Sequence, residues 1–449
     1  MNHHTSPIKY DADQPLGTVS LSAQQMAELD RYFTNVTFFE RDHWPHKLSG
    51  HNRTVTVKST AKKLSDFLLE PALHQAIAHH LPSPATVITA RRASLPESLS
   101  RTGYKFVALR PRLFPHLENK VNHRELLSAR MPYPDFAIYD RAALTPGDFP
   151  RLADDRDTFV LQDEQLSSGV GTFVIREPAD LGRALSVLRI HSKATRVVVS
   201  NYISGARERS VQAVVTSHGT FVGPLSKQII RDPQLTTVGL PGSRLFCGGE
   251  IDPADPCRSA YPEIKHLSEV VGDMLRTQGY RGIFGLDFLV KDSGQIYFLE
   301  LNARPTSMTP LLTQLERRDQ DIPFYLLNLL EWAEMPYSIS GTFSDLPQAG
   351  SMLALHPPNH KSVDLHAVLP GIYKWDATAK QVSFVRPGYR LDEVGQNEFL
   401  LEHEGAQGTV YQPGERLLNL YFTECSLNTD DSVKERCREI VAAVYALLT

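Results

Sequence analysis

The stretch that most constrains the fold is Gly279–Thr309, in which two apolar segments flank the polar turn Lys291–Gly294. This pattern predicts a β-hairpin of two buried strands. In a hairpin centred on that turn, Gly285 lies opposite Glu300, and Asp287 is a diagonal neighbour of Glu300 on the same face. The sequence therefore predicts a largely apolar sheet that carries two acids close together.

Two carboxylates this close in a medium of low dielectric are costly unless a cation joins them. Asn302 continues the same face, and carboxylate and amide oxygens are the ligands that Mg²⁺ prefers, usually with a phosphate completing the shell. Arg304 follows with a planar fork that suits phosphate or carboxylate. We therefore predict a Mg²⁺ (or Mn²⁺) site formed by Asp287, Glu300 and Asn302. The alternative is a half-buried hairpin whose acids reach solvent.

The pattern G-x-D-F followed by Y-x-x-E-x-N-x-R-P, which spans Gly285–Pro305, resembles the metal-binding strand pair of the ATP-grasp superfamily. The resemblance implies an α+β fold in which two subdomains grip ATP. Ligases of this superfamily phosphorylate a carboxylate, and an amine or another nucleophile then attacks the acyl phosphate. In that scheme Arg304 stabilises the transferring phosphoryl group.

The resemblance also implies nucleotide contacts along the chain. Lys120 matches a lysine that contacts the phosphates, Lys227 lies where a basic residue is common, and a Ser/Gly run between two strands resembles the loop that closes over the phosphates. Glu208 is a candidate for the ribose hydroxyls because a carboxylate accepts two such bonds, although a charged loop residue is an equal alternative. The candidate catalytic residues are Arg304 and Lys227. The candidate nucleotide-binding residues are Lys120, Gln162, Ser167, Ser168, Gly169, Gly171, Thr172, Ser200, Asn201, Tyr202, Ile203 and Glu208.

Two positions depart from the pattern of the superfamily. Gln162 stands at the end of a predicted strand where a lysine is usual, which removes one positive charge near the phosphates. Either Lys120 compensates for this loss or the nucleotide affinity is reduced. Ser200 stands where a glutamate is frequent, but backbone recognition of adenine requires no particular side chain.

The 449 residues are too many for one ordinary core and suggest several lobes. We expect an N-terminal α/β pre-ATP-grasp lobe at 1–118, an ATP-grasp domain at 119–340, and a small β-rich C-terminal domain at 345–449. The ATP-grasp domain would divide into 119–195, with the Gly-rich loop, and 196–340, with the metal site. A long irregular segment, Arg231–Asp255, is expected to be a substrate-facing loop in which Arg244 contacts an anion.

Composition excludes several other classes of function. The net charge is -4 without a long basic run, so a nucleic-acid partner is not expected. The four cysteines are scattered and indicate neither a zinc site nor a disulfide framework. No secretory signal or membrane-length apolar run is visible, so we expect a cytoplasmic location without a membrane partner.

The leading functional hypothesis is an ATP-dependent carboxylate–amine ligase that forms an amide or peptide bond and releases ADP and phosphate. Its partners would be a small carboxylic acid and an amine, such as an amino acid or a peptide, and a homodimer is an option. One alternative is a biotin carboxylase-like enzyme that activates bicarbonate, although the chain lacks the usual biotin-attachment segment. The other is a non-catalytic nucleotide-binding subunit, for which Gln162 is the best support.

Overall fold

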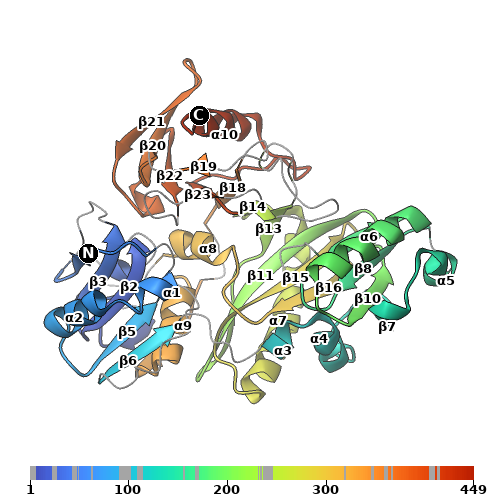
Figure 1. The fold of residues 1–449 in the computed structure, drawn as a ribbon, viewed down its shortest axis with the longest axis horizontal. Helices are drawn as coiled ribbons and strands as arrows, with labels where there is room; N and C mark the ends of the chain where they lie inside the picture. The colour runs from blue at the N-terminus through green and yellow to red at the C-terminus, as the bar shows by residue number, and fades with distance from the viewer. Residues whose placement is uncertain are drawn as a thin grey trace.

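The computed structural model shows a molecule of several lobes, with the N-terminal lobe at one side and the C-terminal strands above the centre (Figure 1). It describes residues 7–22, 28–42, 48, 50–61, 64–89, 103–108, 115–154, 157–166, 171–230, 232, 235, 246–317, 320–344, 348–357, 363–365, 368–403, 410–411 and 415–448. No helix within these ranges is both long and apolar enough to cross a membrane.

The N-terminal lobe is a parallel sheet in the order β4-β3-β2-β5-β6. Its strands are β2 (Leu16–Ser22), β3 (Val36–Asp42), β4 (Arg53–Thr56), β5 (Ala85–Thr89) and β6 (Tyr104–Ala108). The chain between β4 and β5 forms two helices, α1 (Leu64–Phe67) and α2 (Pro71–His80), rather than one. The break arises because Pro71 lacks a backbone N–H and is therefore favoured at the start of a helix rather than inside one.

A small antiparallel sheet in the order β7-β10-β8-β9 follows two short helices. These elements are α3 (Pro115–Glu118), α4 (Lys120–Leu127), β7 (Phe136–Asp140), β8 (Phe159–Asp163), β9 (Thr172–Ile175) and β10 (Arg196–Asn201). One face packs on α6 (Pro178–His191) through an apolar cluster that includes Phe159 and Leu161. Because side chains alternate along a strand, Gln162 of β8 lies on the opposite face.

The largest sheet among the described residues has eleven strands, in the order β16-β15-β11-β13-β14-β18-β24-β22-β20-β21, with β12 beside β11. Its first half consists of β11 (Ala206–Thr216), β12 (Gly219–Val222), β13 (Ser226–Ile230), β14 (Phe246–Ile251), β15 (Gly282–Lys291) and β16 (Ile296–Asn302). Its second half consists of β18 (Gly350–Leu355), β20 (Gly371–Asp376), β21 (Gln381–Arg386), β22 (Glu398–Glu402) and β24 (Leu418–Phe422). The expected C-terminal strands therefore extend the sheet that contains the β15–β16 hairpin.

Helices cover this large sheet. α7 (Tyr261–Thr277) packs its apolar side on the first half, while α8 (Thr309–Leu315) and α9 (Phe324–Ala333) lie between that half and the N-terminal lobe (Figure 1). α10 (Glu435–Ala446) packs on the C-terminal strands. Two short strand pairs, β1 (Ile8–Tyr10) with β17 (Tyr337–Ile339) and β19 (Val363–Asp364) with β23 (Val410–Tyr411), complete the described strands.

The segment Arg231–Asp255 is not the irregular loop that we expected along its whole length. Its second half forms β14, which pairs with β13 on one side and with β18 on the other. The length and irregular sequence of this segment indicated a loop, but at Gly248 the backbone φ is +134°, and an added Cβ would lie 2.2 Å from the Met352 carbonyl oxygen. The glycine thus permits the close approach of two strands. Arg244 lies outside the described residues.

Candidate nucleotide and metal site

The predicted acidic hairpin exists, but its register differs from the expected one. Phe288 pairs with Phe298, and the register shifts by one residue so that Asp287 pairs directly with Glu300. Leu299 is therefore the extra residue of a β-bulge. The prediction of diagonal neighbours was wrong, since Gly285 pairs with Asn302, two residues beyond the expected Glu300. The bulge accounts for one residue of this difference, and the pairing of Val290 with Ile296 at the turn accounts for the other. Residues directly opposite each other share a face, so the two carboxylates lie closer than predicted.

Asp287 is held by polar side chains from three other strands. Its Oδ1 accepts hydrogen bonds from Ser210 Oγ at 2.6 Å and Gln228 Nε2 at 2.7 Å, and its Oδ2 accepts one from Asn302 Nδ2 at 3.1 Å. Burial, together with the charge of Glu300, raises the pKa of Asp287 to about 6, against an ordinary value of 3.8. Protonation of Asp287 is therefore favoured while no cation is bound, and its carboxylate oxygens, once ionised, fit a divalent cation.

Sequence reasoning missed Ser210 and Gln228. Ser210 pairs with Asp287 across β11 and β15, and Gln228 reaches the same carboxylate from β13. Ser210 follows the charged residues Arg207–Arg209 in the polar half of β11, so no local pattern singles it out. Nothing local in the sequence indicates that β13 lies beside β11.

Lys120 joins the two sheets at this point. It is 3% exposed, and its Nζ lies 3.2 Å from Glu300 Oε1 and donates to the Leu166 carbonyl oxygen at 2.7 Å. Asn119 positions it by capping α4, since the Asn119 side chain accepts hydrogen bonds from the Val121 and Asn122 backbone N–H groups. The structure thus brings together Lys120, which follows the cap of a helix beside the small sheet, and Glu300 of the large sheet.

Arg304 also lies with the predicted metal ligands. Its Nη2 donates to Asn302 Oδ1 at 3.0 Å, and its Nε lies 3.1 Å from Glu118 Oε1. The guanidinium is partly exposed, so it can contact a ligand without leaving the site. A guanidinium only donates hydrogen bonds, so the atom of Asn302 that faces Arg304 is Oδ1, and Nδ2 faces Asp287.

Gln162 and Thr172 meet across β8 and β9. Gln162 Oε1 accepts a hydrogen bond from Arg124 Nη2 at 2.7 Å, and Gln162 Nε2 donates to Thr172 Oγ1 at 3.4 Å. Gly171 precedes Thr172, and a Cβ there would lie 2.7 Å from Leu166 Cβ, so this end of the loop requires glycine. Ser167, Ser168 and Gly169 lie outside the described residues.

The candidate adenine segment ends β10. Ser200 is buried and pairs with Phe136, and Asn201 donates from Nδ2 to Asp135 Oδ2 at 3.2 Å. Tyr202, which follows, is exposed, and Ile203 is half-buried. These placements are compatible with an accessible backbone edge, and the adenine contact itself stays a prediction.

Glu208 lies on β11 two residues before Ser210, so it shares the face that carries Asp287. This residue belongs to a strand rather than to the loop that was the alternative. Its contact with the ribose stays a prediction.

The structure does not bring Lys227 to this site. Adjacent residues of a strand point to opposite faces, and Gln228 already points to Asp287. Lys227, 2% exposed, instead donates to Glu250 Oε1 at 2.9 Å and Asp252 Oδ2 at 3.0 Å. Burial opposes its charge, but these two hydrogen bonds prevail and raise the pKa of Lys227.

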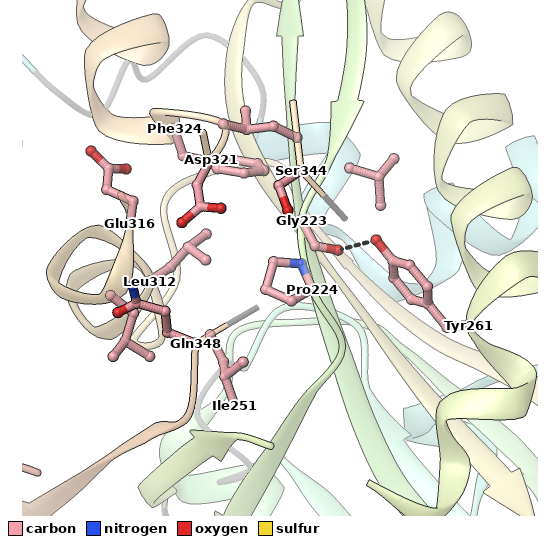
Figure 2. A pocket seen from close by; sticks show the side chains of 13 residues that line it. Gly223, Pro224, Ile251, Tyr261, Leu312, Glu316, Asp321, Phe324, Ser344 and Gln348 are labelled. Carbon is pink, nitrogen blue, oxygen red and sulfur yellow. Dashed lines mark hydrogen bonds between the residues drawn. The ribbon is translucent and has the colours of Figure 1, made fainter. Parts of the chain in front are cut away.

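Two pockets lie away from these residues. Figure 2 shows a narrow one between the β12–β13 connection and helices α8 and α9, where the Tyr261 hydroxyl donates to the Gly223 carbonyl oxygen at 2.8 Å. A wider pocket of about 360 Å³ is lined in part by Arg31, Arg317 and Arg390. None of the candidate residues lines either pocket. The carboxylate pair, with its electrostatic demand for a cation, therefore identifies the site better than pocket shape does.

Comparisons with known proteins agree with this geometry. A family model described as an ATP-grasp domain matches residues 118–308. A search of curated protein sequences found no match.

Solved structures share the fold of almost the whole chain at low sequence identity. N5-carboxyaminoimidazole synthase from Aspergillus clavatus, in complex with ADP and 5-aminoimidazole ribonucleotide, is 12% identical with a TM-score of 0.54, over 97% of this chain and 99% of that one. The Staphylococcus aureus N5-carboxyaminoimidazole synthetase complexed with ADP is 12% identical with a TM-score of 0.52, over 98% and 99%. The biotin carboxylase domain of Hydrogenobacter thermophilus 2-oxoglutarate carboxylase is 11% identical with a TM-score of 0.55, over 92% and 86%.

The match of the family model covers both the small sheet and the β15–β16 hairpin, which are the two parts that meet at Lys120 and Glu300. The arrangement of strands and helices around them is α+β, as expected. Residues 118–308 therefore form an ATP-grasp domain, within a chain that has the ATP-grasp fold.

Proposed function

We propose that this chain is an ATP-dependent ligase that activates a carboxylate as an acyl phosphate and joins it to an amine, releasing ADP and phosphate. One observation carries the proposal: Asp287 and Glu300 pair directly on adjoining strands, and Lys120 of α4, beside the neighbouring sheet, contacts Glu300. Two half-buried acids beside a buried lysine form a site for a metal–phosphate group at the junction of two subdomains.

The residues of the site have separate roles in this reaction. Asp287, Glu300 and Asn302 would hold Mg²⁺, which when bound neutralises phosphate charge so that two anions can approach each other. Lys120 binds phosphate oxygens, and Arg304 stabilises the transferring phosphoryl group with its planar fork. The segment from Ser167 to Thr172 covers the phosphates and excludes water, which would otherwise hydrolyse the acyl phosphate. Holding the reactants in line supplies much of the rate enhancement.

A second candidate is activation of bicarbonate, for which the biotin carboxylase domain of similar fold gives a specific reason. That domain was solved with MgADP and bicarbonate. The acid would then be bicarbonate, while the same residues would bind the nucleotide. A peptide or amino-acid substrate, a homodimer and a cytoplasmic location also stay predictions.

An ADP-release screen tests the proposal. The purified protein is incubated with Mg²⁺ and ATP against carboxylic acids paired with amines, and against bicarbonate with and without biotin, and product masses are recorded. Glu300→Ala and Arg304→Ala should each reduce turnover by about 100-fold or more while the circular dichroism spectrum is unchanged. Glu177→Ala, an exposed acid of the same domain, is the matched control.

Each outcome of the screen has a defined meaning. Turnover that survives in both Glu300→Ala and Arg304→Ala contradicts the proposed site. ADP release that depends on biotin selects the bicarbonate reaction. Tight ATP binding without ADP release against any pair of substrates selects a non-catalytic subunit and refutes the ligase.

A further inference from the structure

Arg124, on the second turn of α4, is a buried cation without a carboxylate partner among the ion pairs of the described residues. It is 1% exposed, and its guanidinium lies 5.3 Å from the ring centroid of Tyr133 and 5.7 Å from that of Phe136. Its Nε has no hydrogen-bond partner. Burial lowers the pKa of Arg124, although the charge of the nearby Glu300 opposes this. Buried charges are normally paired, so this one indicates an anion that binds nearby.

The hydrogen bonds of Arg124 fix the amide of Gln162. A guanidinium has only donors, so the atom of Gln162 that meets Arg124 Nη2 at 2.7 Å must be the carbonyl oxygen Oε1. Gln162 Nε2 therefore faces away from Arg124, and its two hydrogens can be donated to other groups. The only bond it makes among the described residues is a long one, 3.4 Å, to Thr172 Oγ1.

These groups converge where the two sheets of the ATP-grasp domain meet. Gln162 lies on the face of the small sheet opposite its helix-packed face, and Thr172 follows the phosphate loop. Arg124 Nη1 donates to the carbonyl oxygen of Lys120 at 3.0 Å, and Lys120 Nζ contacts Glu300. Lys120, Arg124 and a directed amide donor thus gather beside the Asp287–Glu300 pair, where a divalent cation bound with a polyphosphate would supply charges that match both the acids and the cations.

We infer that Gln162 is a phosphate-binding donor of the nucleotide site and that Arg124 is the positioning residue that orients it and supplies charge behind it. The inference rests on the proposed function, since it assigns these residues to the phosphates of the same nucleotide. It also explains how the site functions without a lysine at position 162, because the positive charge comes from α4 rather than from β8.

A charge exchange between the two positions tests this inference. The variants are Gln162→Ala, Arg124→Met, Gln162→Lys and the double variant Arg124→Met/Gln162→Lys. Dissociation constants for ATP, ADP and adenosine are measured by calorimetry. Gln162→Ala and Arg124→Met should weaken ATP and ADP binding by about tenfold or more, while adenosine binding is unchanged, because a hydrogen bond to a charged group is lost.

Gln162→Lys alone should also weaken ATP binding, since it places an ammonium against the buried guanidinium of Arg124. The double variant should recover most of the ATP affinity, because the introduced lysine then replaces the Arg124 guanidinium as the buried cation beside the phosphates. Arg183→Gln, which removes an exposed positive charge from α6, is the control and should leave the ratio of ATP to adenosine affinity unchanged. A purely structural defect would change adenosine binding as well, so the ratio isolates the phosphate contact.

Different results would refute the proposed ligase function and the inferred roles of Gln162 and Arg124. Wild-type protein that binds no ATP would refute both the proposed function and this inference. ATP affinity that is the same in wild type and Gln162→Ala, or a double variant no better than Gln162→Lys, would overturn the inference alone. The Gln162 variants decide the question even if Arg124→Met does not fold, because Gln162 is only half-buried.

Discussion

The raised pKa of Asp287 predicts a specific pH dependence of metal binding. Burial, reinforced by the charge of Glu300, moves this pKa from an ordinary 3.8 to about 6. A protonated carboxyl is a poor metal ligand, so the proton and the metal compete. At a pKa of about 6, Asp287 is roughly 90% protonated at pH 5 and roughly 10% protonated at pH 7. The apparent affinity for metal should therefore fall about tenfold between pH 7 and pH 5.

Mn²⁺ alone, without nucleotide, is the appropriate probe because ATP itself titrates in this range. Free Mn²⁺ is followed by electron paramagnetic resonance, and calorimetry in buffers of different ionisation enthalpy gives the protons released. At pH 6 about half a proton should be released for each ion bound. Asp292→Asn, in the exposed turn of the same hairpin, is the matched control and should behave like wild type.

A metal affinity that hardly changes with pH is expected if the pKa of Asp287 is not raised. An aspartate with its ordinary pKa would change the affinity by less than about 10% over the same range. An affinity that changes less than twofold, or Asp287→Asn protein that retains the tenfold dependence, would refute the reasoning. The same rise in the pKa of Asp287 determines how the free energy of unfolding changes with pH. The folded metal-free protein binds this proton more tightly than the unfolded chain does, so its free energy of unfolding should fall as the pH rises from about 4 through about 6.

Two further predictions concern parts of the fold that support the site. Lys227→Met should lower the free energy of unfolding by about 3 kcal/mol or more in urea titrations, because it leaves Glu250 buried without its partner, whereas Lys380→Met, at an exposed ion pair, should change it little. An unaltered midpoint for Lys227→Met would contradict this account of the network. Gly248→Ala should destabilise the junction of β14 and β18, since the added Cβ would lie 2.2 Å from a backbone oxygen. Hydrogen exchange of those strands measures the effect, and wild-type protection in the variant would count against it.

Local chemistry allowed much of this protein to be predicted from its sequence. The hairpin of Gly279–Thr309 and the two strands that flank the Ser/Gly run follow from alternation and turn residues, which depend on neighbours in the chain. The ATP-grasp resemblance also rested on a contiguous pattern. The acids at 287 and 300 were placed on one face for the same reason, since alternation along a strand is a local property.

The tertiary structure determined which distant segments of the chain pair with each other. The bulge at Leu299 made Asp287 and Glu300 direct partners, and the position of β13 beside β11 gave Gln228 to the site while turning Lys227 away from it. The bond between Arg124 and Gln162 joins residues 38 positions apart. Backbone hydrogen bonding between strands and the burial of charge depend on which surfaces meet, and that is set by the packing of the whole chain rather than by any single stretch of it.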